Sequence, residues 1–334
     1  MRMKSLTAVA LATPASALIR FGCSQLVVER LDPLVTPGSN PSPHLQQIIG
    51  GARDKCLHGK DDINAFNATM DPESGDIAER ATCTTCQFSE DFSNYWTAML
   101  FFRARNGSYH RVPQIPNVGF DGQKGGMTVY YMQDALANYE QTSKVTAFKT
   151  GFRMLIGDAS YRTKEQANRF RQITYTCLQD LSTRFPETMD FPKEPCPTGI
   201  MANVRFPTCW DGKNLDSPDH MSHMSYPETG TFESGGPCPA SHPVRVPQLM
   251  YETIWDTSQF NSKDLWPEDG SQPFVCTGFG SHGDFMFGWK GDALQRAMDS
   301  PCYVNCPTLK TQSIDEMNKC SVPNVVDEVI DGCK

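Results

Sequence analysis

The sequence contains no long apolar run. A short apolar stretch lies near the start of the chain, at residues 6–12, and neither it nor any later segment reaches the roughly 20 residues that a membrane-spanning helix needs. The last residues, 324–334, are charged, which does not fit a glycolipid anchor signal. We therefore expect no association with a membrane.

Positive charge is also scarce. The chain has 30 Lys and Arg against 38 Asp and Glu, a formal net charge of −8. No basic field would attract nucleic acid or another polyanion, so these partners are disfavoured, whereas a neutral or cationic sugar polymer remains compatible. The sequence also has no internal repeat, no low-complexity linker and no dinucleotide or P-loop fingerprint.

The first residues have the pattern of a secretory signal peptide. Basic Arg2 and Lys4 precede the apolar stretch, and the small residues 15–17 form a cleavage site, so the mature chain is predicted to begin at Leu18. Without Arg2 and Lys4 the formal charge is 28 − 38 = −10. We expect a secreted, monomeric protein of the cell wall or medium, with residues 18–334 in a single extracellular domain.

Thirteen cysteines in a secreted chain predict disulfides. The CxxC at residues 83–86 lacks a strand-then-helix context, so redox and zinc roles are disfavoured. Cys56 lies in the charged segment 52–63, which we interpret as an insertion or a retained intron. Asn67 and Asn106 begin glycosylation sequons and are expected in surface loops. Structural disulfides are expected for Cys83, Cys86, Cys177, Cys196, Cys209, Cys238, Cys276, Cys302, Cys306 and Cys320.

Strand-like runs dominate the chain. Seven segments are rich in β-branched and aromatic residues and are bounded by turn residues. Pro247 in the sixth segment predicts a sheet edge or bulge. The segments are residues 95–104, 109–115, 127–132, 145–156, 200–206, 244–255 and 285–289.

Helices are few. An apolar stripe predicts one over residues 292–299, Ser313 with Glu316 forms the capping box of a second, and residues 163–172 are a third candidate. We predict a mainly β protein, with a β-sandwich or jelly-roll-like core, a few short helices and many disulfide-braced loops.

The segment from Cys209 to Pro227 carries the densest set of reactive side chains. It holds Asp211, Asp216, Asp219, His220 and His223 and has no helical or strand periodicity. Imidazole and carboxylate groups are the side chains of proton transfer and metal binding near neutral pH. This loop is therefore the first candidate for a site.

Eight segments carry a resemblance to a known family. They are HLQQIIGG, NAFNATMDP, GGMTVYYMQ, FKTGFRMLIGD, FPTCWDGKNLDSPDHMSHMSYP, GPCPASHPVRVPQL, GFGSHGDFMFGWKGDALQRAMD and NCPTL. Over about residues 31–320 the chain resembles the secreted fungal domain-of-unknown-function family numbered nineteen ninety-six. The resemblance implies a fungal extracellular protein with a role around cell walls or polysaccharides, and it supplies no reaction.

The chain departs from the family pattern in two places. The family has His-x-His before Ile-x-Gly-Gly, whereas this chain has His44 and then Gln46. The family also continues directly from Gly-Gly to Asn-Ala-Phe, whereas residues 52–63 intervene here. The first difference weakens any site that needs both histidines, and the second supports an insertion around Cys56.

The resemblance directs attention to three polar clusters. They are His44 with Gln46, the Asp216–His223 group, and His282 with Asp284. Our hypothesis is that they converge on one concave site, which is the pattern of an active site. The hypothesis fails if the imidazoles of His44, His220 and His282 lie far apart.

Two carbohydrate chemistries fit these residues. Glycoside hydrolysis needs two carboxyl groups about 5–5.5 Å or 6.5–9.5 Å apart, from Asp216 with Asp219 or Asp284. A polysaccharide lyase needs a base, an acid and a cation, although the net negative charge counts against a polyuronate. The candidates are His220 or His223 as base, Tyr131 as acid, and Arg153 or Arg245 as cation.

Other chemistries are less favoured. We predict no cofactor, but a loop would allow His220, His223 and Asp219 or His282 to hold a divalent metal. Oxidative copper enzymes use an N-terminal histidine, which Leu18 excludes. Ser281, in GFGSHG, misses a nucleophile elbow because Phe279 replaces the first glycine.

A purely structural interpretation accompanies these. Asp and Asn residues in 212–220 are turn formers, and His220 and His223 would then only cap loops. Trp210, Trp255, Trp266 and Trp289 are expected in the core.

We predict activity on cell-wall or extracellular polysaccharide, of hydrolase or lyase type. The alternative is a non-catalytic glycan-binding or structural wall protein.

Overall fold

The computed structural model describes residues 18–52, 76–132, 145–229, 236–275, 279–300, 302 and 304–332. The predicted signal peptide, Asn67 and Cys56 lie outside these residues, as does the predicted insertion beyond its first residue, Ala52. Ala52 is the last residue of a buried strand.

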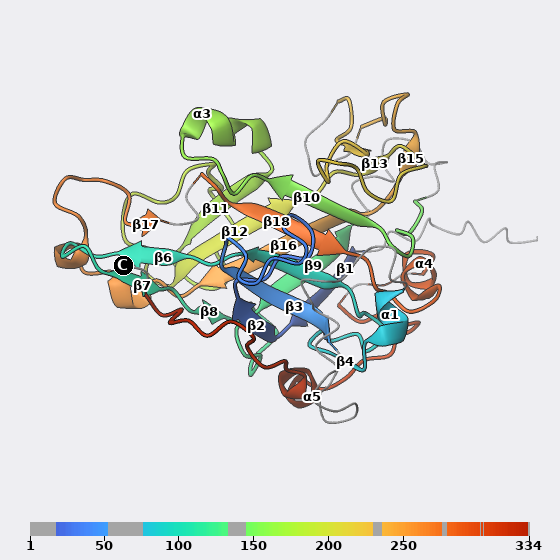
Figure 1. Ribbon diagram of the computed structural model, residues 1–334, viewed down its shortest axis with the longest axis horizontal. Coiled ribbons are helices and arrows are strands. Elements are labelled where there is room, and N and C mark those ends of the chain that lie inside the picture. The colour runs from blue at the N-terminus through green and yellow to red at the C-terminus, as the bar shows by residue number, and fades with distance from the viewer. Residues whose placement is uncertain are drawn as a thin grey trace, which may run out of the picture.

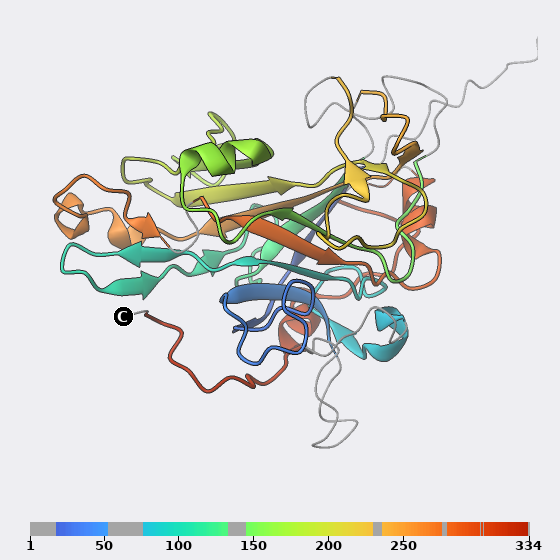
Figure 2. The same ribbon diagram turned by 45° about the horizontal axis from the view of Figure 1, so that its top comes forward.

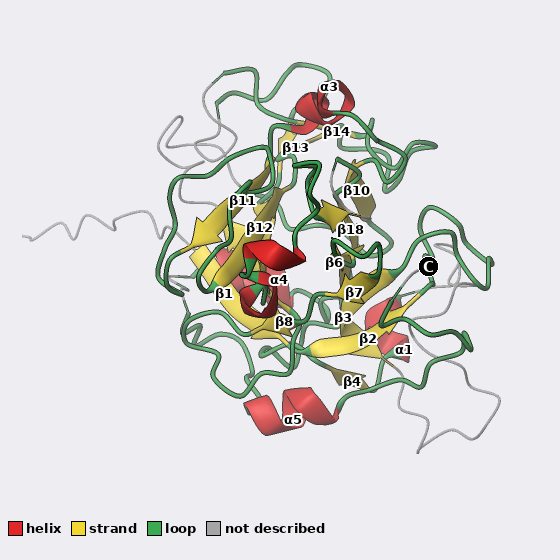
Figure 3. Ribbon diagram, turned by 90° about the vertical axis from the view of Figure 1, so that its left-hand side faces the viewer, coloured by secondary structure: helices red, strands yellow, loops and turns green. Residues whose placement is uncertain are grey.

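Two antiparallel six-stranded sheets form the body of the protein (Figure 1). The first sheet has the order β1 (Leu18–Cys23), β9 (Met127–Met132), β16 (Gln248–Trp255), β12 (Gly199–Arg205) and β11 (Ile173–Leu178), with β8 (Gln114–Ile115) on β16. The second has the order β10 (Arg153–Gly157), β18 (His282–Met286), β5 (Asn94–Ala98), β3 (Gln46–Ala52) and β2 (Gln25–Glu29), with β4 (Cys83–Thr84) on β3. Figure 3 shows the two sheets side by side, so the predicted mainly β class is confirmed.

Smaller elements extend the sandwich. One three-stranded sheet contains β14 (Met224–Ser225), β13 (Cys209–Trp210) and β15 (Val244–Arg245), and another contains β17 (Phe274–Val275), β6 (Phe101–Arg103) and β7 (Tyr109–Arg111). The helices are α1 (Ile77–Arg80), α3 (Lys164–Ala167), α4 (Ala293–Met298) and α5 (Ile314–Lys319). Short 3₁₀ helices also occur at Asn168–Phe170, Ser258–Phe260 and Lys263–Leu265.

Hydrophobic side chains pack on both faces of the second sheet. Between the sheets, Tyr95 of β5 contacts Tyr251 of β16, with their ring centroids 5.7 Å apart. On the outer face, Ile48, Trp96 and Met286 belong to a separate buried cluster. Residues of the 31–34 loop and of the C-terminal segment after α5 complete that cluster. Both segments therefore cover the face of the second sheet that points away from the first.

Several predicted elements match the structure closely. The strand over 127–132 has the predicted bounds, and Pro247 separates β15 from β16. The Ser313 side chain accepts a hydrogen bond from the Glu316 backbone amide at the start of α5, which is one of the two bonds of the predicted capping box. Of the run 145–156 only the end is strand, because Gly151 has a φ of +87° within a turn.

Five disulfides brace the described residues. They are Cys23–Cys86, Cys83–Cys320, Cys177–Cys196, Cys209–Cys238 and Cys302–Cys306. Cys83 and Cys86 bond to different partners, so the CxxC is not a disulfide of its own. Cys23 was not among the cysteines predicted to form disulfides, and Cys276, which was, lies outside the described residues.

Surface and core residues follow the sequence predictions. Asn106 is exposed in the turn between β6 and β7, and the four tryptophans expected in the core are all buried. In the part of the chain that the structure describes, no helix is long and apolar enough to cross a membrane.

Candidate active site

Strand β18 places two polar side chains on the outer face of the second sheet. A Cβ atom added at Gly283 would point toward the first sheet, where it would lie 2.8 Å from Val204 and 3.4 Å from Tyr251. Because side chains alternate along a strand, His282 and Asp284 point to the opposite face. Both are buried.

His282 has hydrogen-bond partners at both ring nitrogens. Its Nδ1 lies 2.9 Å from the carbonyl oxygen of Gly280, which can only accept, so Nδ1 carries the proton. Its Nε2 lies 3.1 Å from the side-chain nitrogen Nε2 of Gln46 and accepts a hydrogen bond from it. Burial lowers the pKa of His282. The imidazole is therefore held neutral in one tautomer.

His44 precedes β3 and lies beside His282. The two ring centroids are 6.1 Å apart. His44 is half-buried, and its ring nitrogens make no hydrogen bond to another described residue. Burial lowers its pKa, and charge on His282 and Arg162 lowers it further, while Asp32 and Asp158 act in the opposite direction. Near neutral pH His44 is thus an unprotonated imidazole with no hydrogen-bond partner at its ring nitrogens among the described residues.

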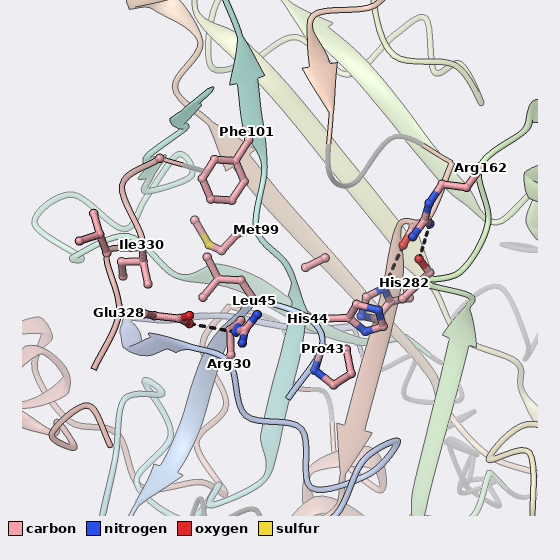
Figure 4. Close-up of a pocket in the computed structure, with 15 residues that line it drawn as sticks. Arg30, Pro43, His44, Leu45, Met99, Phe101, Arg162, His282, Glu328 and Ile330 are labelled. Carbon is pink, nitrogen blue, oxygen red and sulfur yellow. Dashed lines mark hydrogen bonds and ion pairs between the residues drawn. The ribbon is translucent and has the colours of Figure 1, made fainter. Parts of the chain in front are cut away.

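Both histidines line a pocket of about 270 Å³ (Figure 4). One side is apolar and includes Leu45, Met99 and Phe101. The opposite side carries His44, His282 and Arg162. Among the described lining residues Glu328 is the one acidic side chain, and it is paired with Arg30 at 3.1 Å. The pocket therefore offers an apolar wall facing an imidazole and a guanidinium.

Two buried carboxyl groups lie behind the histidines. Both oxygens of Asp284 lack a hydrogen-bond partner among the described residues, and one lies 3.6 Å from His282 Nε2. Burial raises the pKa of Asp284 well above its usual range, and the nearby charge of Asp32 raises it further. Burial also raises the pKa of Asp32, against its hydrogen bonds from Val35 and Leu34. Neither carboxyl group lines the pocket.

The Asp216–His220 loop lies along the edge of β10. The Arg153 amide donates to the Leu215 carbonyl at 3.0 Å, and the Leu155 amide donates to the His220 carbonyl at 2.9 Å. The His220 Nδ1 lies 2.8 Å from Asp216 Oδ1. Leu155 pairs with Asp284 across the sheet, which brings this loop near the β18 residues. Charge on His44 and on His220 acts to lower the pKa of Asp32, against the larger effect of burial.

His223 and Asp219 do not line the pocket. His223 is buried, its Nε2 donates to the Arg153 carbonyl at 2.7 Å, and its Nδ1 lies 2.8 Å from Ser217 Oγ. Partial burial opposes charge on Asp219, but hydrogen bonds from Ser222, Ser217 and Met221 outweigh it and hold its pKa below its ordinary value. These two residues brace the loop, as the structural interpretation predicts.

The structure thus brings some of the predicted residues together and separates others. His44 and His282 share the pocket, with Asp284 behind His282 and the Asp216–His220 pair at the sheet edge. Tyr131 lies in the core between the sheets. Its hydroxyl is hydrogen-bonded to the Tyr95 hydroxyl and accepts a hydrogen bond from the Trp289 indole. Arg162, Asp32 and the C-terminal wall of the pocket could not be predicted from the sequence, because no motif marks residues that meet only through tertiary structure.

A metal centre finds little support in the geometry. Within the described ranges no group of three or more His, Cys, Asp or Glu side chains is arranged to hold a metal ion. The amide of Gln46 also occupies the His282 nitrogen that a metal would need.

Fold and site together define a disulfide-braced β-sandwich with an imidazole-containing pocket on the outer face of one sheet. The chain belongs to the family described as a domain of unknown function (DUF1996), whose model matches residues 32–289. No curated protein and no solved structure matches the chain significantly.

Proposed function

We propose that the protein is an extracellular lyase that acts on an acidic polysaccharide through the His44 pocket. The observation that carries the proposal is that one pocket is lined by both His44, whose ring has no hydrogen-bond partner among the described residues, and the guanidinium of Arg162. Elimination from a uronate requires a base, a cation and an acid for the departing oxygen, and one imidazole can serve as base and then as acid. The five disulfides support an oxidising, extracellular location.

The pocket has the size and polarity for one sugar unit. Its volume of about 270 Å³ is near the lower end of small-ligand pockets. Leu45, Met99 and Phe101 would contact the apolar face of the ring, and Arg162 would bind the carboxylate. Although the whole chain is acidic, this pocket has two arginines and two histidines against the single acidic side chain of Glu328.

The reaction follows from these positions. His44 removes the proton from C5 of the uronate, next to the carboxylate. The electron pair forms a C4=C5 double bond while the C4–O bond breaks, and the departing oxygen takes the proton from the His44 imidazolium. Arg162 stabilises the negative charge that develops on the carboxylate in the transition state. No oxidant, reductant or second substrate is consumed.

Hydrolysis has less support. It needs two carboxyl groups on either side of the scissile bond. Glu328 is paired with Arg30, and Asp284 and Asp32 are buried outside the lining of the pocket. Asp219 serves as a hydrogen-bond acceptor within its own loop.

The test is a panel of neutral and acidic polysaccharides assayed for both binding and product release. We expect acidic polymers alone to yield products with the ultraviolet absorbance of a conjugated double bond. His44→Ala should lower turnover roughly 10²–10⁴-fold, the usual contribution of a general base. Arg162→Ala should mainly raise KM for acidic polymers.

The matched control is His110→Ala, which removes an exposed imidazole bonded only to Ser108 among the described residues. Its turnover should equal that of the wild type. Binding of glycans without products under any condition would instead establish the non-catalytic alternative.

A further inference from the structure

The segment after α5 forms one side of the pocket. Residues 321–332 contain no helix or strand, and they run from α5 back towards β6 and β7 (Figures 1 and 2). Four of them, Glu328, Val329, Ile330 and Gly332, line the pocket. In Figure 4 Glu328 and Ile330 lie on the side opposite His44 and Arg162.

The first half of this segment is held by buried contacts. Cys320 is bonded to Cys83, and Val322 is buried in the outer hydrophobic cluster. The amides of Val325 and Val326 both donate to the buried carboxylate of Glu29. Contacts of this kind are costly to break, since they leave a buried acceptor without its donors.

The second half is held by more exposed contacts. Arg30 pairs with Glu328 at 3.1 Å, with 34% and 28% of their side chains exposed. Arg111 pairs with Asp331 at 2.8 Å, and the Asp331 side chain is 75% exposed. Exposed ion pairs contribute only about 0–1 kcal/mol each. Val329 is 84% exposed, so apolar burial adds little at that residue.

We infer that residues 328–332 are an end wall that restricts the pocket to the ends of saccharide chains. The inference rests on the proposed function for the identity of the ligand. A polymer threaded through the site would have to pass through the space that Glu328, Val329 and Ile330 occupy. A chain end needs only the opening beside His44 and Arg162. Specificity for chain ends would thus come from a segment outside both sheets.

The test is a chain shortened after Asp327, which retains the Glu29 contacts and loses the wall. We expect the wild type to release only short products from the polymer ends and to leave a polymer with chemically blocked ends intact. The shortened chain should cut the blocked polymer and give products of many lengths. Identical product lengths from the two proteins would overturn the inference.

A readout without glycan separates this inference from the proposed function. Diethyl pyrocarbonate modifies accessible imidazoles, and peptide mass spectrometry reports the rate at His44. The shortened chain should be modified several-fold faster there and at an unchanged rate at His110. An unchanged rate at His44 would overturn the wall. A faster rate in a protein that neither binds nor cleaves any glycan would retain the wall and reject the function.

Glu316→Gln is the matched control for a change of charge in this region. Glu316 is exposed on α5, pairs with Lys319 and does not line the pocket. This variant should match the wild type in product lengths and in the modification of His44.

Discussion

His44 and His282 lie in one pocket, but their surroundings give them different roles. Gly280 and Gln46 hold both nitrogens of His282, which is 3% exposed. His44 is more exposed and has no hydrogen-bond partner among the described residues. In the proposed reaction His44 is therefore the base, and the neutral His282 supports it through its fixed position. The Gln46 that stands at the family's second histidine is part of this support.

His223 has a structural role that mutation should reveal. We expect His223→Ala to lower the free energy of unfolding by about 3 kcal/mol, because it removes a buried ring and leaves the Arg153 carbonyl without its donor. Denaturant unfolding measures the loss. Turnover per folded molecule should stay within about twofold, since His223 does not line the pocket. A stable variant without turnover would contradict this assignment.

Asp91 makes the stability of the fold depend on pH. Burial raises its pKa to about 7, against hydrogen bonds from Tyr95 and Ser93. The folded state thus keeps a proton that the unfolded state, with its carboxyl near the ordinary 3.8, loses. The stabilisation is fully present below pH 3.8 and is lost as the pH rises through about 7. It amounts to at most ~4 kcal/mol.

Thermal unfolding of Asp91→Asn across this pH range checks the prediction. Other buried carboxyl groups titrate in both proteins, so the difference between the variant and the wild type isolates Asp91. The variant should lose less stability than the wild type between pH 4 and pH 7. If the stabilities of the two proteins fell in parallel between pH 4 and pH 7, Asp91 would already be ionised at the acid end of the range, contrary to the prediction.

At the scale of elements, strands with regular alternation could be predicted and buried polar strands could not. Residues 127–132 alternate and form β9 as predicted. Strand β3 is buried along its whole length although it begins with Gln46 and Gln47. The Gln47 side chain accepts a hydrogen bond from Gln114, a partner distant in the sequence. No local pattern could reveal that pairing.

The sequence also predicts the wrong bounds for strand β18, because this strand too contains buried polar residues. The sequence predicts a strand over residues 285–289, whereas the strand spans His282–Met286. His282 and Asp284 suggest a loop when only local polarity is considered, yet both are buried in the sheet. The resemblance to the family still placed both residues in the candidate site, although it gave no structural reason.

Gly283 couples the spacing of the two sheets to the site. In Gly283→Ala the new methyl group would lie 2.8 Å from Val204 and 3.2 Å from Phe206. The sheets would have to separate, at a cost of ~1–3 kcal/mol. We expect lower stability in urea together with weaker glycan binding, because His282 and Asp284 move with β18. Full stability in this variant would contradict the close approach of the sheets.

At the scale of the whole molecule, the site forms where six segments of the chain meet. Residues near positions 30, 44, 100, 162, 282 and 330 all line the pocket. The sequence identified His44 and His282 because they have reactive side chains within family-like segments. It could not identify Arg162 or Ile330, whose role depends on how the loops and the C-terminal segment cross the second sheet.

The same geometry explains why the loop richest in Asp and His is not the centre of the site. Asp216 and Asp219 hold turns, and His223 is buried beneath β10. Composition marks this loop as reactive, but hydrogen bonds to its own backbone occupy most of these groups. His220 is in turn held by Asp216, whose Oδ1 lies 2.8 Å from the His220 Nδ1.

The central claim is that the His44 pocket performs elimination and not hydrolysis. The most direct measurement is the mass of products formed from an acidic polysaccharide in water labelled with a heavy oxygen isotope. We predict products that contain no labelled oxygen. Of the two fragments from each cut, the one with the new unsaturated end should be lighter by one water than its hydrolysis counterpart, and His44→Ala should form roughly 10²–10⁴-fold less product. Products that carry the label at the cleaved end, or equal amounts from His44→Ala, would contradict the account.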